Sequence, residues 1–229
     1  MGLLITVEGG EFTGKTTVVV PGLVEKIKEM GVAVLHSREP GGTFAGEQMR
    51  KKIFELLEKG IDAATLAHLF NEARALHIRD VIIPFFAAHH EQAVVILDRY
   101  LDSTRVYQGF EGGAPFSLLF DLEKKYVKEF FPNITIILYF PDEIFAQTLE
   151  FRRNKSANDT SRDHNKLDEG EISFHHKRQN YYLQCVELSK QLGEHREFIL
   201  VNAAQPPEKV LQDAWVGIHQ AVSNLTLKK

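Results

Sequence analysis

The chain has 229 residues, of which 44% are hydrophobic and 25% are charged, and this composition is typical of a globular protein with a sizeable core. Its net charge of −4 gives no overall basic field, which argues against a partner that is a nucleic acid or a membrane surface. The single cysteine excludes an intrachain disulfide and favours a reducing, cytoplasmic location. We see no signal peptide, and no apolar run approaches the roughly 18 residues that a membrane span needs.

The first element is predicted by the apolar residues 3–7, which are typical of a buried parallel strand. A glycine-rich loop, EGGEFTGKTT, follows at residues 8–17 and contains the full G-x-x-x-x-G-K-[ST] pattern of a phosphate-binding loop. A helix-length segment at residues 17–30 comes next. Together the three segments direct backbone N–H groups and a helix N-terminus at one point, which suits a polyphosphate.

Every residue of this loop is a candidate for nucleotide contact: Gly9, Gly10, Glu11, Phe12, Thr13, Gly14, Lys15, Thr16 and Thr17. Lys15 can reach the β- and γ-phosphates of a nucleotide, and the Thr16 hydroxyl can bind Mg²⁺. Glu11 needs another role, because a carboxylate is repelled by polyphosphate. A hydrogen bond to a sugar hydroxyl of a second substrate and an idle, exposed carboxylate are equally favoured by the residues alone.

The rest of the chain alternates strands and helices. Further strands are predicted at residues 32–36, 93–97, 134–140 and 198–201, and further helices at 45–59, 63–87 with a break near Pro84, 116–130, 142–153 with Asp142 as N-cap, 171–191 and 207–222. The polar residues 154–168 predict a mobile lid, and residues 223–229 a frayed tail. This order predicts one domain with a five-stranded parallel sheet covered by helices on both faces, and ligands at the carboxyl ends of its strands.

Several side chains at these strand ends and on the helices can carry chemistry. Asp98 and Arg99 follow a buried strand, where an acid can hold Mg²⁺ through water and an arginine can bind a phosphate. A strand-end ion pair is the alternative, and the neighbouring phosphate loop favours the functional interpretation. Phe70 and Arg74 share one helix face and can stack on and donate to a base, although spacing alone favours a core phenylalanine and a surface arginine.

The aromatic Tyr107 and the amide of Gln108 follow Asp98 and Arg99 closely, and such a pair can recognise a nucleoside. Basic residues surround the predicted lid: Arg152, Arg153, Lys155 and Arg162. On a lid they can stabilise a transferring phosphoryl group, whereas at a solvated helix end they only complement the helix dipole. We assign the second role to Arg152.

The sequence resembles the thymidylate kinase family. The stretches that carry the resemblance come in the family's order and rough spacing: EGGEFTGKTT, REPGGT at residues 38–43, F-x-x-x-R at 70–74, DRYLDSTRVYQG at 98–109 and SRDHNKLDEGEISFHHK at 161–177. It extends from residue 3 to about residue 203 and is closest to the bacterial type, in which the lid carries the catalytic arginines. It implies a P-loop NTPase fold, ATP-dependent phosphorylation of dTMP to dTDP with Mg²⁺, and a homodimer.

The resemblance also implies roles for individual residues. Lys15, Arg99, Arg153 and Arg162 would be catalytic, and Thr16 and Asp98 would bind the metal. Glu11 would face the deoxyribose 3′-hydroxyl. Phe70 would stack on thymine, and Arg74 would donate to a carbonyl of the base. The remaining residues implied to bind the substrate are Arg38, Glu39, Pro40, Arg50, Thr104, Tyr107 and Gln108, with Tyr107 under the sugar.

Some positions depart from the family pattern. Phe12 stands where relatives have glycine or arginine, so the missing charge is expected from the lid. Pro21 should distort the opening of the first helix. The other departures are Tyr139, Lys166 and the absence of a basic residue in 109–113. They leave the rate and the strictness for one nucleoside open, but not the reaction class. The alternatives are a deoxynucleoside monophosphate kinase of broader specificity, a nucleotide-binding regulatory module, and a relative that binds nucleotides but turns over poorly.

Overall fold

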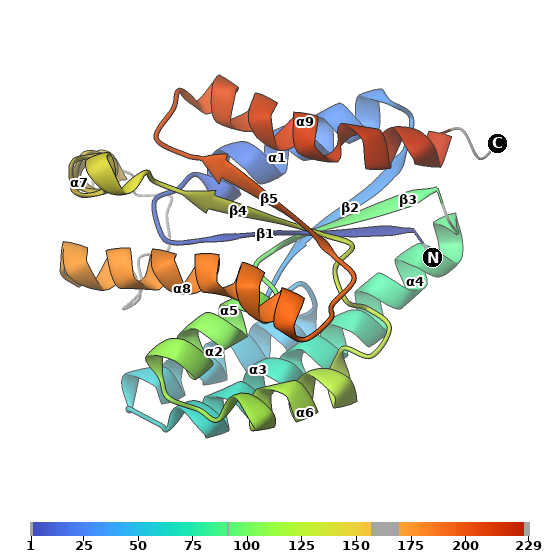
Figure 1. The fold of residues 1–229 in the computed structure, drawn as a ribbon. Helices are drawn as coiled ribbons and strands as arrows, with labels where there is room; N and C mark the ends of the chain where they lie inside the picture. The colour runs from blue at the N-terminus through green and yellow to red at the C-terminus, as the bar shows by residue number, and fades with distance from the viewer. Residues whose placement is uncertain (1, 91, 157–169, 227–229) are drawn as a thin grey trace.

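The computed structural model describes residues 2–90, 92–156 and 170–226 of the chain. Its centre is one sheet of five parallel strands, in the order β2-β3-β1-β4-β5 (Figure 1). The strands are β1 (Leu3–Gly9), β2 (Ala33–Arg38), β3 (Ala93–Asp98), β4 (Ile134–Tyr139) and β5 (Glu197–Asn202). All five predicted strands are therefore confirmed, and their carboxyl ends meet at one edge of the sheet.

Helices cover both faces of the sheet, as the unbroken apolar strands predict. On one face lie α1 (Val20–Glu29) and α9 (Pro207–Thr226), which pack on Ile5 and Val7 of β1 (Figure 1). On the other face, Leu4 of β1 packs with residues of η2 (Ile78–Ile82) and α4 (Ile83–His89). Because successive side chains of a strand point to opposite faces, the single strand β1 contributes to both cores.

The remaining helices lie beside the carboxyl edge of the sheet or on its second face. They are η1 (Lys15–Val19), α2 (Phe44–Glu58), α3 (Ala63–His77), α5 (Leu101–Thr104), η3 (Arg105–Glu111), α6 (Phe116–Tyr126), η4 (Asp142–Ile144), α7 (Phe145–Ser156) and α8 (Ile172–Gln191). On the second face, α8 packs on Ile137 of β4 (Figure 1). No helix in the described ranges is both long and apolar enough to cross a bilayer.

Both prolines that were expected to disturb a helix do so. Pro21 is the second residue of α1, and the turn before it, η1, is π-helical. Pro84 occupies the same position in α4 and follows the π-helical turn η2, which separates α4 from α3. Because proline lacks an N–H and crowds the preceding turn, each helix restarts at its proline.

Two sequence predictions are wrong, and two helical elements were not predicted. Asp142 is not an N-cap: it opens the 3-10 turn η4, and its carboxylate pairs with His176 of α8. Residues 223–226 are not frayed, because they continue α9 and Leu225 packs into the core; residues 227–229 lie outside the described part. Residues 101–111 were left without an element, yet they form α5 and η3.

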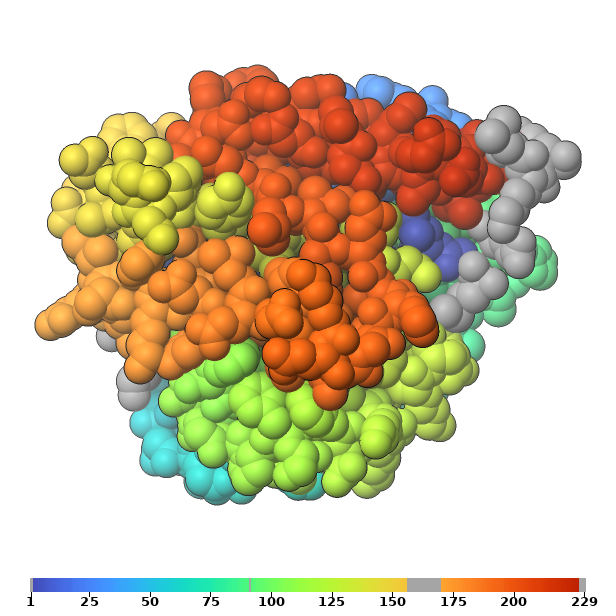
Figure 2. All heavy atoms as spheres, viewed as in Figure 1, coloured from blue at the N-terminus to red at the C-terminus, as the bar shows by residue number. Residues whose placement is uncertain are grey.

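A buried cluster of charges fixes this segment. Arg105 of η3 is fully buried and donates to both oxygens of Glu123 of α6, at 2.8 and 2.6 Å. Arg105 also pairs with Glu194. Glu194 accepts a hydrogen bond from Arg196 at 2.9 Å, and Arg196 also donates to the fully buried Asp102 of α5 at 2.8 Å. In Figure 2 the atoms of α8 (orange) lie directly against this green part of the chain. The cluster thus ties α5 and η3 to α6 and to the turn after α8.

Candidate active site

The phosphate loop curls around the ammonium group of its own lysine. Lys15 Nζ donates to the carbonyl oxygens of Gly9 and Gly10, at 2.9 and 2.7 Å. Gly9 has a φ of 128°, and a Cβ there would lie 2.4 Å from the carbonyl oxygen of Leu138, so only glycine fits where the loop leaves β1. Burial and the charge of Arg99 lower the pKa of Lys15 to about 8. A polyphosphate in the loop would offset both effects.

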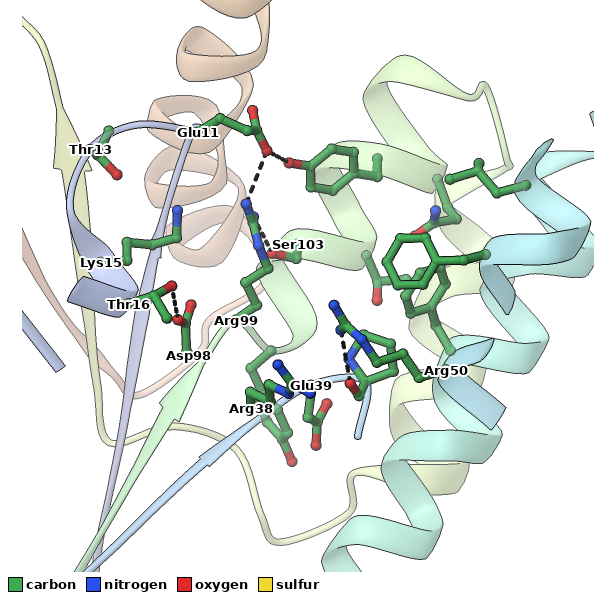
Figure 3. A pocket seen from close by; sticks show the side chains of 18 of the residues that line it. Glu11, Thr13, Lys15, Thr16, Arg38, Glu39, Arg50, Asp98, Arg99 and Ser103 are labelled. Carbon is green, nitrogen blue, oxygen red and sulfur yellow. Dashed lines mark hydrogen bonds and ion pairs between the residues drawn. The ribbon is translucent and has the colours of Figure 1, made fainter. Parts of the chain in front are cut away.

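A pair of oxygen donors lies beside the loop. The Thr16 hydroxyl donates to the carboxylate of Asp98 at the end of β3 (Figure 3). A hydroxyl and one carboxylate are hard oxygen ligands, and Mg²⁺ typically takes only one or two such protein ligands beside water and phosphate oxygens. The two residues therefore fit the predicted metal site.

Arg99 lies between the phosphate loop and the opposite wall of the site. Figure 3 shows its guanidinium between Lys15 on one side and Arg50 on the other. It donates to Glu11 Oε1 at 3.0 Å and to the Tyr182 hydroxyl at 2.6 Å. Its backbone has a φ of 68°, a conformation that a non-glycine residue rarely adopts. Such strain at a charged, partly exposed side chain is typical of a functional site.

Glu8 lies directly under this arginine. Its carboxylate is fully buried and accepts hydrogen bonds from the Tyr100 N–H and the Ser103 hydroxyl, both at 2.7 Å. Burial and the negative charge of Asp102 raise the pKa of Glu8 to about 7. Glu8 was not among the predicted site residues; the sequence made it the first residue of the phosphate loop, whereas in the structure it belongs to β1.

This pKa predicts a pH-dependent stability. Below pH 4.5 the carboxyl is protonated in both the folded and the unfolded chain; between pH 4.5 and 7 only the unfolded chain releases the proton, so the contribution of Glu8 to stability falls as pH rises. Glu8→Gln removes this loss. The free energy of unfolding is measured with urea at pH 5 and pH 8. From pH 5 to pH 8, the value for Glu8→Gln minus the value for the wild type should rise by about 2–3 kcal/mol. An unchanged difference between the two proteins at both pH values would contradict the raised pKa.

Glu11 lies at the centre of a network of donors. Its Oε1 accepts from Arg99 and from the Tyr107 hydroxyl, and its Oε2 accepts from Arg178 of α8 at 2.7 Å. His175 lies nearby, with its Nδ1 at 3.5 Å from Glu11 Oε2. Burial alone would raise the pKa of Glu11, but this histidine and the positive charges around it hold the pKa well below its usual value. The interpretation of Glu11 as an idle, exposed carboxylate is therefore wrong.

The opposite wall is built around Arg74. Its guanidinium is buried and donates to Glu39 Oε2 at 2.7 Å and to the Thr104 hydroxyl at 3.1 Å. The other oxygen of Glu39 lies 2.9 Å from His77 Nδ1. The interpretation of Arg74 as a surface residue is wrong, because its partners from two other segments, Glu39 after β2 and Thr104 of α5, hold it inside. Phe70 lies one turn earlier on the same helix and faces the same space.

These groups line one cavity of about 1190 Å³. The predicted site residues that line it are Glu11, Phe12, Thr13, Gly14, Lys15, Thr16, Thr17, Arg38, Glu39, Pro40, Arg50, Phe70, Arg74, Asp98, Arg99, Thr104, Tyr107 and Gln108. Gly9 and Gly10 support the loop from behind through the two carbonyls that Lys15 contacts. Arg50 donates to the Pro40 carbonyl at 3.1 Å and so holds the turn after β2 against α2.

The basic residues of α7 are placed differently from the prediction. Arg152, which was assigned to a solvated helix end, lines the cavity and donates to the carbonyls of Ala203 and Gln205. Arg153 is not part of the cavity wall; it donates to the Gly170 carbonyl at 3.2 Å. Of the predicted lid, residues 154–156 are the last turn of α7, and the rest, with Arg162 and Lys166, lies outside the described residues.

Comparison with known proteins agrees with this geometry. The family model described as thymidylate kinase matches residues 7–214. The thymidylate kinases of Bacillus cereus (strain AH187), Bacillus anthracis (strain A0248) and Bacillus thuringiensis subsp. konkukian are each 32% identical to this chain over 212 residues, which cover 93% of the chain and 94% of the relative. The chain belongs to the thymidylate kinase family. It is a nucleoside monophosphate kinase with the P-loop NTPase fold.

Some residues of this thymidylate kinase site were not found from the sequence. They are His77, Glu111, His175, Arg178 and Tyr182, each of which contacts a predicted site residue or lines the cavity, and Glu8, which is linked to Arg99 through the Ser103 hydroxyl. Most are charged residues on helices, which sequence patterns assign to the surface. Their partners lie far away in the chain, so local spacing carried no signal for them.

Proposed function

We propose that this protein transfers the γ-phosphoryl group of ATP to dTMP and forms dTDP, with the two nucleotides lying end to end in the cavity. The observation that supports this most strongly is that two sets of residues face each other across Arg99. The phosphate loop forms one set, and the wall with Phe70, Arg74 and Thr104 forms the other. A protein that only binds or hydrolyses one nucleotide needs no second wall of this kind.

The phosphate loop is the site for ATP. Lys15 and the backbone N–H groups that follow Gly14 would hold its phosphates, and the cavity continues from there to Arg152, Lys155 and Pro207. Thr16 and Asp98 would hold Mg²⁺. When bound, the metal neutralises charge on the β- and γ-phosphates, and the protein's own part is to fix the two ligands and the surrounding donors.

The opposite wall is the site for dTMP. The thymine ring of dTMP stacks on Phe70, Arg74 donates to a carbonyl of the base, and Glu11 accepts from the 3′-hydroxyl of the sugar. The attacking group is an oxygen of the monophosphate, whose second pKa is about 6, so it is largely ionised at pH 7 and needs no strong general base. The protein therefore acts by positioning and by neutralising charge, chiefly through Lys15 and Arg99.

Other features complete the proposal. Phe12 supplies no charge beside the phosphates, so we propose that the lid provides it through Arg162 and through Arg153, which would have to leave the Gly170 carbonyl to reach the phosphates. We further propose that the chain is a single domain, that it acts in the cytoplasm and that it forms a homodimer, as the resemblance to bacterial thymidylate kinases implies.

A coupled assay of ADP release tests the function. ATP is supplied with dTMP, dUMP, dCMP, dAMP or dGMP in turn, and dTMP should give the highest rate. Comparable rates with several nucleotides would favour the alternative of a broader deoxynucleoside monophosphate kinase. No ADP above the level with ATP alone would favour a regulatory nucleotide-binding module or a poorly active relative.

Arg74→Ala tests the assignment of the dTMP wall. The variant loses the donor to the base and should raise the KM for dTMP by about 10- to 100-fold, as expected for a hydrogen bond from a charged group. The KM for ATP should change by less than about twofold, because Arg74 does not contact the phosphate loop. Arg79→Ala is the matched control, since Arg79 lies on the following turn, is exposed and pairs with Asp80. An equal loss of affinity for both nucleotides would remove Arg74 from the base site.

A further inference from the structure

Arg178 of α8 lies directly behind the wall of the cavity. Its side chain is about 1% exposed, and it is not among the residues that line the cavity. Two carboxylates that do line it, Glu11 and Glu111, both accept hydrogen bonds from its guanidinium. They are separated by 100 positions in the chain, and Arg178 joins them.

The guanidinium uses its planar fork for this purpose. Nη1 donates to Glu11 Oε2 at 2.7 Å, whereas Nε and Nη2 donate to the two oxygens of Glu111 at 2.6 and 3.1 Å. The Tyr107 and Phe174 rings each lie 4.6 Å from the guanidinium carbon. A lysine could not reproduce this arrangement, because it offers a point charge without a fork.

The consequence is that three elements are locked together at Glu11. The phosphate loop contributes Glu11, the end of η3 contributes Glu111, and α8 contributes Arg178. Tyr107 belongs to the same unit, since its ring covers the guanidinium and its hydroxyl donates to Glu11. Glu11 therefore has one fixed orientation, with Oε1 turned to Arg99 and Tyr107 and Oε2 turned to Arg178.

We propose that Arg178 is a positioning residue for the sugar of the acceptor nucleotide: clamped by Glu111, it holds the Glu11 carboxylate where it accepts the hydrogen bond from the 3′-hydroxyl of dTMP. This inference rests on the proposed function, because it requires dTMP to lie against Glu11. Arg178 touches no reacting atom and acts only through Glu11.

A structural role for Arg178 is the competing explanation. Removal of a buried arginine that joins two acids destabilises a protein wherever it lies. The two explanations differ in the ligand: a positioning role concerns the 3′-hydroxyl alone, whereas general loosening of the site affects every nucleotide. A substrate that lacks the 3′-hydroxyl separates them.

The experiment measures KM and kcat for dTMP and for 3′-deoxythymidine monophosphate, at saturating ATP, in the wild type and in Arg178→Met. In the variant the KM for dTMP should rise about tenfold, as expected when one charge-assisted hydrogen bond, from the 3′-hydroxyl to Glu11, is lost. The KM for the 3′-deoxy analogue should change by less than about twofold, because this analogue makes no bond to Glu11. The kcat for dTMP should also stay within about twofold.

Arg196→Met is the matched control. Arg196 is equally buried and also joins two acids, Asp102 and Glu194, but neither acid is a residue of the cavity wall. The variant Arg196→Met should lower the thermal midpoint as Arg178→Met does. The ratio of its KM for dTMP to its KM for the 3′-deoxy analogue should stay as in the wild type. Glu111→Gln weakens the clamp without removing the guanidinium and should raise the KM for dTMP by about threefold. This variant serves as the test if Arg178→Met does not fold.

The outcomes separate this inference from the proposed function. If the wild type does not phosphorylate dTMP, the proposed function fails before the variants are compared. If the wild type does so and Arg178→Met raises both KM values by the same factor, Arg178 is a structural residue and the inference is overturned.

Discussion

Lys15→Ala is expected to lower the kcat for dTMP phosphorylation by about 10³-fold or more, the order of magnitude for loss of a preorganised donor at a developing phosphoryl charge. The structure gives the reason. Lys15 Nζ already lies within the curl of the phosphate loop, held by two carbonyl oxygens of that loop. Phe12 adds no charge beside it, so no other residue of the loop can compensate.

The measurement is single-turnover formation of dTDP, with the affinity for ATP measured separately by calorimetry. Lys190→Ala is a suitable control, because this lysine is 71% exposed on α8 and pairs with Glu187. Thermal unfolding of Lys15→Ala should stay close to that of the wild type, since the lysine donates only to its own loop in the contacts described. A kcat within tenfold of the wild type would remove Lys15 from the phosphoryl-transfer step.

The part of the fold that could be predicted is the part with a hydrophobic pattern. Strands such as residues 93–97 are apolar throughout, which only a strand buried on both faces requires, and all five were placed correctly. The glycine pattern of the phosphate loop was equally informative, because Gly9 and Gly14 adopt positive φ angles that favour glycine. The order of the strands in the sheet was not predicted, since it depends on contacts between distant segments.

The segment 101–111 shows why the rest could not be predicted. Its polar residues Asp102 and Arg105 are among the most buried in the protein, yet hydropathy assigns such residues to the surface. With its buried face occupied by charges, the segment has no apolar stripe of helical period. Arg74 and Arg178 were misjudged or missed for the same physical reason: an arginine on a helix is typical of a solvated face unless its acidic partners, here Glu39 and Glu111, are known.

The same buried charges lead to the largest expected effect on stability. Arg105→Met should lower the free energy of unfolding by about 3–5 kcal/mol, because it leaves the buried carboxylates of Glu123 and Glu194 without their arginine. Urea unfolding at pH 7 measures it. The affinity for dTMP should fall too, since η3 carries Tyr107 and Gln108 as well as Arg105.

A double variant separates the loss of charge balance from the loss of packing. The wild-type cluster holds three acids, Asp102, Glu123 and Glu194, and two arginines, Arg105 and Arg196. Arg105→Met makes this balance more negative, whereas Arg105→Met combined with Glu123→Met restores it and fills the space with apolar groups. The double variant should therefore recover most of the lost stability, as buried ion pairs replaced as a unit often do. If it is no more stable than Arg105→Met alone, the fork that Arg105 offers to Glu194 is the essential contact, and the charge balance of the cluster is not what holds η3 in place.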